Sequence, residues 1–238
     1  MRKLKKCLSL ILAVAVCMST FFASTTSLEV MAASENEIGN YTDYNNSDDG
    51  NVIIFNVDNA QVKVELCTAR TLRVQLSLNG NEGYRPEDPQ YYMVQKNEWP
   101  LVNKTIEDKG DYIQILTDQI EIRVQKNPFR IGMYDLNGNL ISKDSDDQGM
   151  YWNDLGVRGV KKTEGSTNAG GIFGFGSGDH GRRSNLNRYD QDFSEFSMSH
   201  GRVVAPFFMS TVGYGIFLNT IEKDTTFYKH GGGFQTKI

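Results

Sequence analysis

The chain has 238 residues, of which 39% are hydrophobic, 23% charged and 11% aromatic, enough apolar material for one large domain or two small ones. This composition excludes collagen, a coiled coil, a polytopic membrane protein and a wholly disordered chain. Four of the 25 basic residues and one of the 29 acidic residues lie in the first 32 positions, so the remainder carries a net charge of -7. That acidic excess argues against nucleic-acid binding, which needs a cationic surface.

The first 33 residues have the pattern of a secretory signal peptide. Four cations within the first six residues precede an apolar run from Leu8 to Ala23, and Ala32-Ala33 follows as a small-residue cleavage site. A membrane anchor is the alternative, but polar residues interrupt the run, which is shorter than the about 20 apolar residues of a spanning helix. We therefore expect residues 1–33 to be removed during export, leaving a secreted, extracellular chain without a membrane segment.

Cysteine usage excludes an intrachain disulfide after export. Cys7 and Cys17 lie in the signal segment, so Cys67 is left alone. It stands in an alternating, strand-like pattern with no histidine near it in the sequence. We expect a buried, inert thiol rather than a nucleophile.

Residues 34–50 are nearly all polar and predict a linker or a disordered start. From residue 51 onward the chain repeatedly alternates apolar and polar residues, which is the period of half-buried β-strands. The Asn137-Gly138 pair between two apolar runs is the strongest short signal for a β-hairpin. The alternation predicts strands over residues 62–66, 72–78, 112–116, 120–124, 131–134 and 140–141.

The predicted fold class is all-β. No stretch after residue 33 holds an apolar stripe at helical spacing through three turns, and no repeat of 20 to 50 residues indicates a propeller or solenoid. Antiparallel strands with one solvated face must bury the other face against a second sheet. We expect residues 51–238 to form one large antiparallel β-sandwich, which can be incomplete at its C-terminus.

Three features resemble binding motifs for a dinucleotide, calcium or zinc, but each lacks a part that the binding site needs. Gly176–Gly181 matches G-x-G-x-x-G, but residues 182–188 lack the helical period that a dinucleotide site needs. The Asp144–Gly149 run begins like a calcium loop, yet Leu155 stands where a bidentate Glu is required, so a solvated turn is the better interpretation. The three histidines are too widely spaced for a zinc site. We expect no cofactor and no metal.

Three segments share a family pattern: GIFGFG at 171–176, NLNRYD at 185–190 and APFFMSTVGYGIFLN at 205–219. In this order they resemble the N-terminal β-sandwich of glycoside hydrolase family 31, the α-glucosidase and α-xylosidase family. The resemblance covers roughly Phe55 to Thr220. It implies a galactose mutarotase-like sandwich.

The resemblance also implies that the chemistry is done elsewhere. Family 31 enzymes use two Asp residues of a (β/α)8 barrel that follows the sandwich, one as nucleophile and one as acid/base. The sequence up to Ile238 contains no such nucleophile strand. We assign no catalytic residue here, and we expect an N-terminal part of a larger enzyme or the product of a truncated reading frame.

In the family a sandwich loop reaches over the barrel mouth and shapes substrate subsites. Residues 189–204 occupy the place of that loop, and carboxylates beside an aromatic ring suit sugar hydroxyls. The implied substrate-binding residues are Arg188, Asp190, Asp192 and Phe193, with solvated loop charges as the alternative. Apolar residues left uncovered by the absent barrel are expected among Phe207, Phe208, Phe217 and Phe227.

The partners implied by the resemblance are an α-linked oligosaccharide or polysaccharide and the downstream catalytic barrel of the same protein. The expected function is that of a carbohydrate-binding, substrate-shaping domain in a secreted α-glycoside hydrolase or α-glucosyltransferase. Two other functions stay open on the sequence. One is a stand-alone extracellular carbohydrate-binding sandwich without catalysis, and the other is a structural or adhesion domain.

Overall fold

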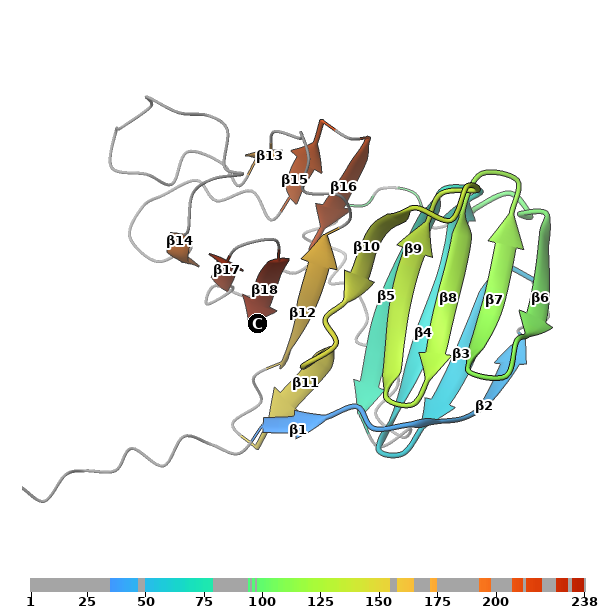
Figure 1. The fold of residues 1–238 in the computed structure, drawn as a ribbon, viewed down its shortest axis with the longest axis horizontal. Helices are drawn as coiled ribbons and strands as arrows, with labels where there is room; N and C mark the ends of the chain where they lie inside the picture. The colour runs from blue at the N-terminus through green and yellow to red at the C-terminus, as the bar shows by residue number, and fades with distance from the viewer. Residues whose placement is uncertain are drawn as a thin grey trace, which may run out of the picture. The chain divides into compact units, whose positions relative to one another are not determined.

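Every regular element in the part of the chain that the structure describes is a β-strand, which confirms the all-β class (Figure 1). The computed structural model describes residues 35–46, 50–78, 94, 96, 98–154, 158–164, 172–174, 193–197, 207–211, 213–219, 226–230 and 233–237. The predicted signal peptide lies outside these residues. Within them, no helix has the length and apolarity to cross a membrane.

The described strands form three sheets, and all their pairings are antiparallel. The four-stranded sheet has the order β2 (Tyr41–Asn46), β3 (Val52–Val57), β4 (Ala60–Thr68), β5 (Thr71–Leu78). The three-stranded sheet has the order β13 (Ile172–Gly174), β15 (Phe207–Ser210), β16 (Tyr214–Phe217).

The third sheet has eleven strands. Its order is β14 (Phe193–Ser197), β17 (Thr226–His230), β18 (Gly233–Lys237), β12 (Arg158–Glu164), β10 (Leu140–Asp144), β9 (Phe129–Tyr134), β8 (Glu121–Lys126), β7 (Tyr112–Thr117), β6 (Lys104–Asp108). Off this path, β11 (Met150–Asn153) pairs with β12 and with β1 (Glu35–Glu37).

The hydrophobic core lies between the four-stranded sheet and strands β7 to β9 of the larger sheet. In Figure 1, strands β3 to β5 lie behind the layer formed by β7 to β9. Alternate residues of each strand point into the core, because successive side chains of a strand project to opposite faces. Phe55 of β3 and Phe129 of β9 meet there with ring centroids 5.9 Å apart, and both are fully buried. The other fully buried core residues are Ile38, Ile53, Val62, Val64, Leu66, Ile113, Ile115, Ile122 and Val124. The predicted β-sandwich is confirmed.

The polar stretch that predicted a linker instead carries β1 and β2, so this expectation is corrected for residues 35–46. Strand β2 is an edge strand that pairs along its length with β3 through backbone hydrogen bonds. The rings of Tyr41 and Tyr44 pack on Phe55, with centroids 6.4 and 5.8 Å away, and Ile38 is fully buried. An edge strand needs few apolar side chains, so its polar composition resembles that of a linker.

The predicted Asn137-Gly138 hairpin is confirmed between β9 and β10. Gly138 has a φ of +82°, a left-handed conformation that glycine adopts without strain. The carboxylate of Asp135 accepts hydrogen bonds from the amides of Asn137 and Asn139 at 2.9 and 2.7 Å. The predicted burial of Cys67 is also confirmed, and burial raises the pKa of its thiol.

The Asp144–Gly149 run divides into two parts. Asp146 and Asp147 are exposed and pair with Lys143 and Lys161 at 2.7 and 3.5 Å, in keeping with a solvated turn. Asp144 is different, because it lies within β10 and only 1% of its surface is exposed. The interpretation as a solvated turn is therefore wrong for Asp144, and it is also wrong for Gln148 and Gly149, which are buried at the other end of the run.

Candidate functional site

Most of the substrate-binding residues that the sequence indicated fall outside the described part of the chain. These are Arg188, Asp190 and Asp192. Phe193 begins β14, at the register position opposite Lys229 of β17. The sugar-binding loop therefore stays a prediction.

Two of the three segments that carry the family pattern are joined in the three-stranded sheet. Segment 171–176 supplies β13, and segment 205–219 supplies β15 and β16. Their register pairs Phe173 with Met209, and Met209 with Gly215. Segment 185–190 lies outside the described residues. The pattern therefore encodes strands that are distant in sequence and hydrogen-bonded in space.

Gly174 explains why this pattern requires glycine. Its φ is +138°, and a Cβ placed on it would lie 2.4 Å from the Phe207 carbonyl oxygen and 2.7 Å from the Cα of Phe208. Those atoms belong to backbone and cannot rotate away. A Cβ on Gly215 would likewise meet the Phe208 carbonyl oxygen at 2.9 Å. Both glycines let backbone approach backbone closely within the three-stranded sheet.

The two faces of the three-stranded sheet differ in exposure. Phe208 is 1% exposed and packs edge-on against Tyr214, with ring centroids 6.3 Å apart. Phe207 and its cross-strand partner Phe217 are 38% and 39% exposed. The expectation of an uncovered apolar surface is thus confirmed at Phe207 and Phe217. It is wrong for Phe208, which strand alternation turns to the buried side, and the Phe227 side chain is not described.

A second feature is a groove on the face of strands β7 to β10 that points away from the sandwich core. Its volume is about 520 Å³. Ile122 and Val124 of β8 point into the core, so Arg123 and Gln125 project to the opposite face and line the groove. In the sequence these residues look like the ordinary solvent-facing half of an alternating strand, so nothing there marks them as part of a site.

Arg123 is the centre of the groove. Its guanidinium carbon lies 4.0 Å from the ring centroid of Tyr134 and 5.6 Å from that of Tyr112. The same guanidinium donates two hydrogen bonds to the Glu121 carboxylate, at 2.8 and 2.9 Å, and Gln114 donates a third at 2.6 Å. These bonds, above all those from Arg123, hold the pKa of Glu121 below its usual value. The site is therefore held in one arrangement by charge-assisted bonds.

Gly132 is one of the residues that line the groove. In the sheet it is the cross-strand neighbour of Arg123 on one side and of Lys143 on the other. A Cβ at Gly132 would meet Cε2 of Tyr134 at 2.9 Å and the Cβ of Lys143 at 3.3 Å. The Tyr134 ring therefore occupies the space into which a side chain at this position would project, so glycine lets the ring pack directly against the sheet.

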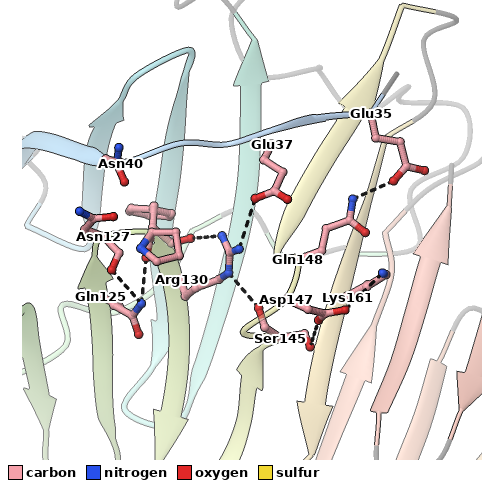
Figure 2. A network of polar contacts seen from close by, with 12 residues as sticks. Glu35, Glu37, Asn40, Gln125, Asn127, Arg130, Ser145, Asp147, Gln148 and Lys161 are labelled. Atoms are coloured by element: carbon pink, nitrogen blue, oxygen red, sulfur yellow. Dashed lines mark hydrogen bonds and ion pairs between the residues drawn. The ribbon is translucent and has the colours of Figure 1, made fainter. Parts of the chain in front are cut away.

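Figure 2 shows the polar network at one end of the groove. Arg130 donates to the backbone carbonyls of Ser145 and Phe129 at 2.8 and 2.9 Å, and Nη2 lies 3.5 Å from a Glu37 oxygen. The Gln125 amide donates to the carbonyls of Asn127 and Pro128 at 3.3 and 3.1 Å. The network ties β1 and the β8–β9 turn to the groove wall.

Each cation of the groove has a carboxylate partner. Besides the pairs made by Arg123 and Arg130, Lys126 pairs with Asp108 and Lys143 pairs with Asp146, both at 2.7 Å. Because the charges are matched, the groove is not an open cationic site. Within the described residues, no group of three or more His, Cys, Asp and Glu side chains is placed to hold a metal ion.

Together the fold and the three-stranded sheet define an antiparallel β-sandwich of the galactose mutarotase-like class. Residues 61–226 match the family model described as the glycosyl hydrolase 31 N-terminal galactose mutarotase-like domain. The chain belongs to this family, which confirms the resemblance seen in the sequence.

Known proteins similar to the chain are larger enzymes. The isomaltosyltransferase of Sporosarcina globispora is 28% identical over 130 residues, which are 50% of this chain and 12% of that protein. The family 31 dextranase of Flavobacterium johnsoniae, solved with isomaltotriose, is 25% identical with a TM-score of 0.67, over 85% of this chain and 25% of that one. The cycloalternan-forming enzyme of Listeria monocytogenes shares the fold, with a TM-score of 0.64 at 18% identity over 87% of this chain and 20% of that one. The chain thus spans a quarter or less of the length of these proteins.

Proposed function

We propose that the chain is the N-terminal domain of a secreted family 31 α-glycoside hydrolase or α-glucosyltransferase, and that it binds and positions an α-linked oligosaccharide beside a catalytic barrel. The observation that carries this proposal is the three-stranded sheet, in which segments of the family pattern meet around Gly174. The similar dextranase was solved with isomaltotriose, and the curated relative is an isomaltosyltransferase. Isomalto-oligosaccharides are therefore the substrates that we propose first.

The uncovered apolar face of the three-stranded sheet supports a neighbouring domain. Phe207 and Phe217 stand side by side on it, next to the exposed Phe173 and Met209. Contiguous exposed apolar residues on a soluble protein usually mark an interface. In the proposal this face lies against the barrel.

The Glu121 carboxylate fits a binding role better than a catalytic one. A retaining glycosidase needs two carboxyl groups about 5 to 5.5 Å apart, one of which must stay protonated as a general acid. The pKa of Glu121 is shifted downward, the opposite of what an acid catalyst needs. A sandwich that orients sugar hydroxyls lends binding energy to a reaction carried out by other residues.

The proposal is tested by assaying the purified chain beside a longer protein that continues through the barrel. The substrates are p-nitrophenyl α-glucoside, p-nitrophenyl α-xyloside and isomaltotriose. We expect turnover by the longer protein alone. Turnover by the 238-residue chain, or a coding sequence that stops at residue 238 with no barrel in any frame, would contradict the proposal.

Secretion is tested separately by N-terminal sequencing of the exported product. We expect it to begin at Ala33 or Ser34, because the small residues at positions 32 and 33 suit a signal peptidase. A product that begins at Met1 would exclude cleavage.

A further inference from the structure

We infer that the groove on the outer face of β7 to β10 is a binding site for a neutral oligosaccharide, formed by residues other than the predicted loop at 189–204. For the carbohydrate class of its ligand this inference rests on the proposed function. The location and the preference for a neutral ligand rest on the geometry of the groove itself.

The size and lining of the groove suit a sugar. Its volume of about 520 Å³ lies within the roughly 300 to 1,000 Å³ of small-molecule sites. The Arg123 guanidinium lies over the Tyr134 ring at 4.0 Å and over the Tyr112 ring at 5.6 Å, and all three residues line the groove, so part of its surface is aromatic and guanidinium rather than aliphatic. A pyranose presents an apolar C–H face and a rim of hydroxyls, which match such a surface.

The charges in the groove favour a neutral ligand over an anion. The four cations Arg123, Lys126, Arg130 and Lys143 are each bound to a carboxylate at 2.7 to 3.5 Å. A phosphate or an acidic peptide would have to displace one of these carboxylates or accept its repulsion. A neutral hydroxyl pair can donate to the carboxylate and accept from the cation of one ion pair without breaking it.

The two arginines of the groove are already held in place before a ligand binds. Arg130 is buried and donates to two backbone carbonyls, while Arg123 is held by two bonds to Glu121 and by two rings. Long side chains that are already ordered lose little entropy when a ligand arrives. Such ordering is unusual for arginines on the outer face of a sheet, whose side chains are normally solvated and mobile.

Isothermal titration calorimetry of the purified chain tests the inference, with isomaltohexaose and maltohexaose as neutral probes and inorganic phosphate as the anionic probe. The two variants are Tyr112→Leu, which removes a ring and a hydroxyl, and Gln125→Ala, which removes an amide. Gln61→Ala is the matched control, because Gln61 projects from β4 on the other sheet and bonds only to Asn56 in the described contacts. Thermal unfolding of each variant verifies that the fold is kept.

We expect at least one neutral probe to bind, about tenfold more weakly to Tyr112→Leu and unchanged to Gln61→Ala. Equal binding by all three variants would mean that the sugar binds elsewhere on the chain. This result would refute the inference that the groove is the binding site, and it would not affect the proposed carbohydrate function. Preference for phosphate, or no binding of either sugar by the folded chain, would also overturn the inference. Failure of the proposed function would give a different result. The longer protein would then have no glycosidase activity, while the groove would still bind sugar.

Discussion

The ammonium group of Lys162 lies 2.6 Å from Oδ1 of Asp144, a carboxylate that is almost completely buried. The two residues are opposite each other in the register of β10 and β12. The second oxygen, Oδ2, accepts the backbone N–H of Ile131 in β9 at 2.9 Å. One carboxylate therefore joins three strands, and it replaces a backbone acceptor where the pairing of β9 with β10 ends.

Replacing Asp144 with asparagine is expected to lower the free energy of unfolding by about 3 kcal/mol, because it leaves Lys162 without its counter-charge and weakens the bond to Ile131. The control is Asp146→Asn, which removes the partner of Lys143 on an exposed turn and should cost no more than about 0.5 kcal/mol. Urea unfolding of both variants measures the difference. Equal effects would show that burial of the Asp144 pair has no energetic consequence.

Replacing Gly174 with alanine is expected to be more damaging than the same change at Gly213. Both glycines have a positive φ, +138° and +100°, so both variants carry backbone strain. At Gly213 nothing lies within 4 Å of the new Cβ, and the cost is about 1 to 2 kcal/mol. At Gly174 the Cβ strikes the backbone of Phe207 and Phe208, which adds a steric penalty of about 1 to 3 kcal/mol.

Thermal unfolding of the two glycine variants separates the cost of backbone strain at a positive φ from the cost of the steric clash between the new Cβ and the backbone of β15. A loss at Gly213→Ala that matches the loss at Gly174→Ala would mean that the three-stranded sheet can shift to admit a side chain. In that case the close approach of β13 to β15 would not be the reason for glycine in the family pattern.

The fold could be predicted from the sequence where successive side chains of a strand alternate between solvent and core, as around Ile122 and Val124. It could also be predicted where Asn137-Gly138 marks a turn. The prediction failed at β1 and β2, because backbone pairing with β3 stabilises residues that have little apolar surface of their own. The outer-face groove was missed for another reason. Arg123, Gly132 and Lys143 come from three strands, and only the register of the sheet places them in a row. The burial of Asp144 could not be predicted, because the Asp-rich run around it gives no sign that β10 pairs with β12 and places Lys162 opposite Asp144.

The lowered pKa of Glu121 predicts a specific acid sensitivity. Since its pKa in the folded chain lies below the usual value of a glutamate, the carboxylate contributes stability at a pH above that usual value, and the contribution is lost as the pH falls through the lower folded value. The variant Glu121→Gln should therefore lose stability at pH 7 and show a flatter decline between pH 5 and pH 3 than the unchanged chain. Urea unfolding at several pH values measures this, and parallel declines in the two proteins would refute the assignment to Glu121.

The strand β15 offers a test of the uncovered apolar face by two neighbouring substitutions. Phe208→Ser removes a buried ring and is expected to destabilise the chain by about 3 to 5 kcal/mol. Phe207→Ser changes a ring that is 38% exposed, and it should cost far less while reducing self-association of the purified chain. Analytical ultracentrifugation and urea unfolding measure the two effects. If Phe207→Ser leaves self-association unchanged and destabilises the chain as much as Phe208→Ser does, the Phe207 side is packed within the sandwich in solution. The proposed contact with a following barrel would then lose its apolar surface.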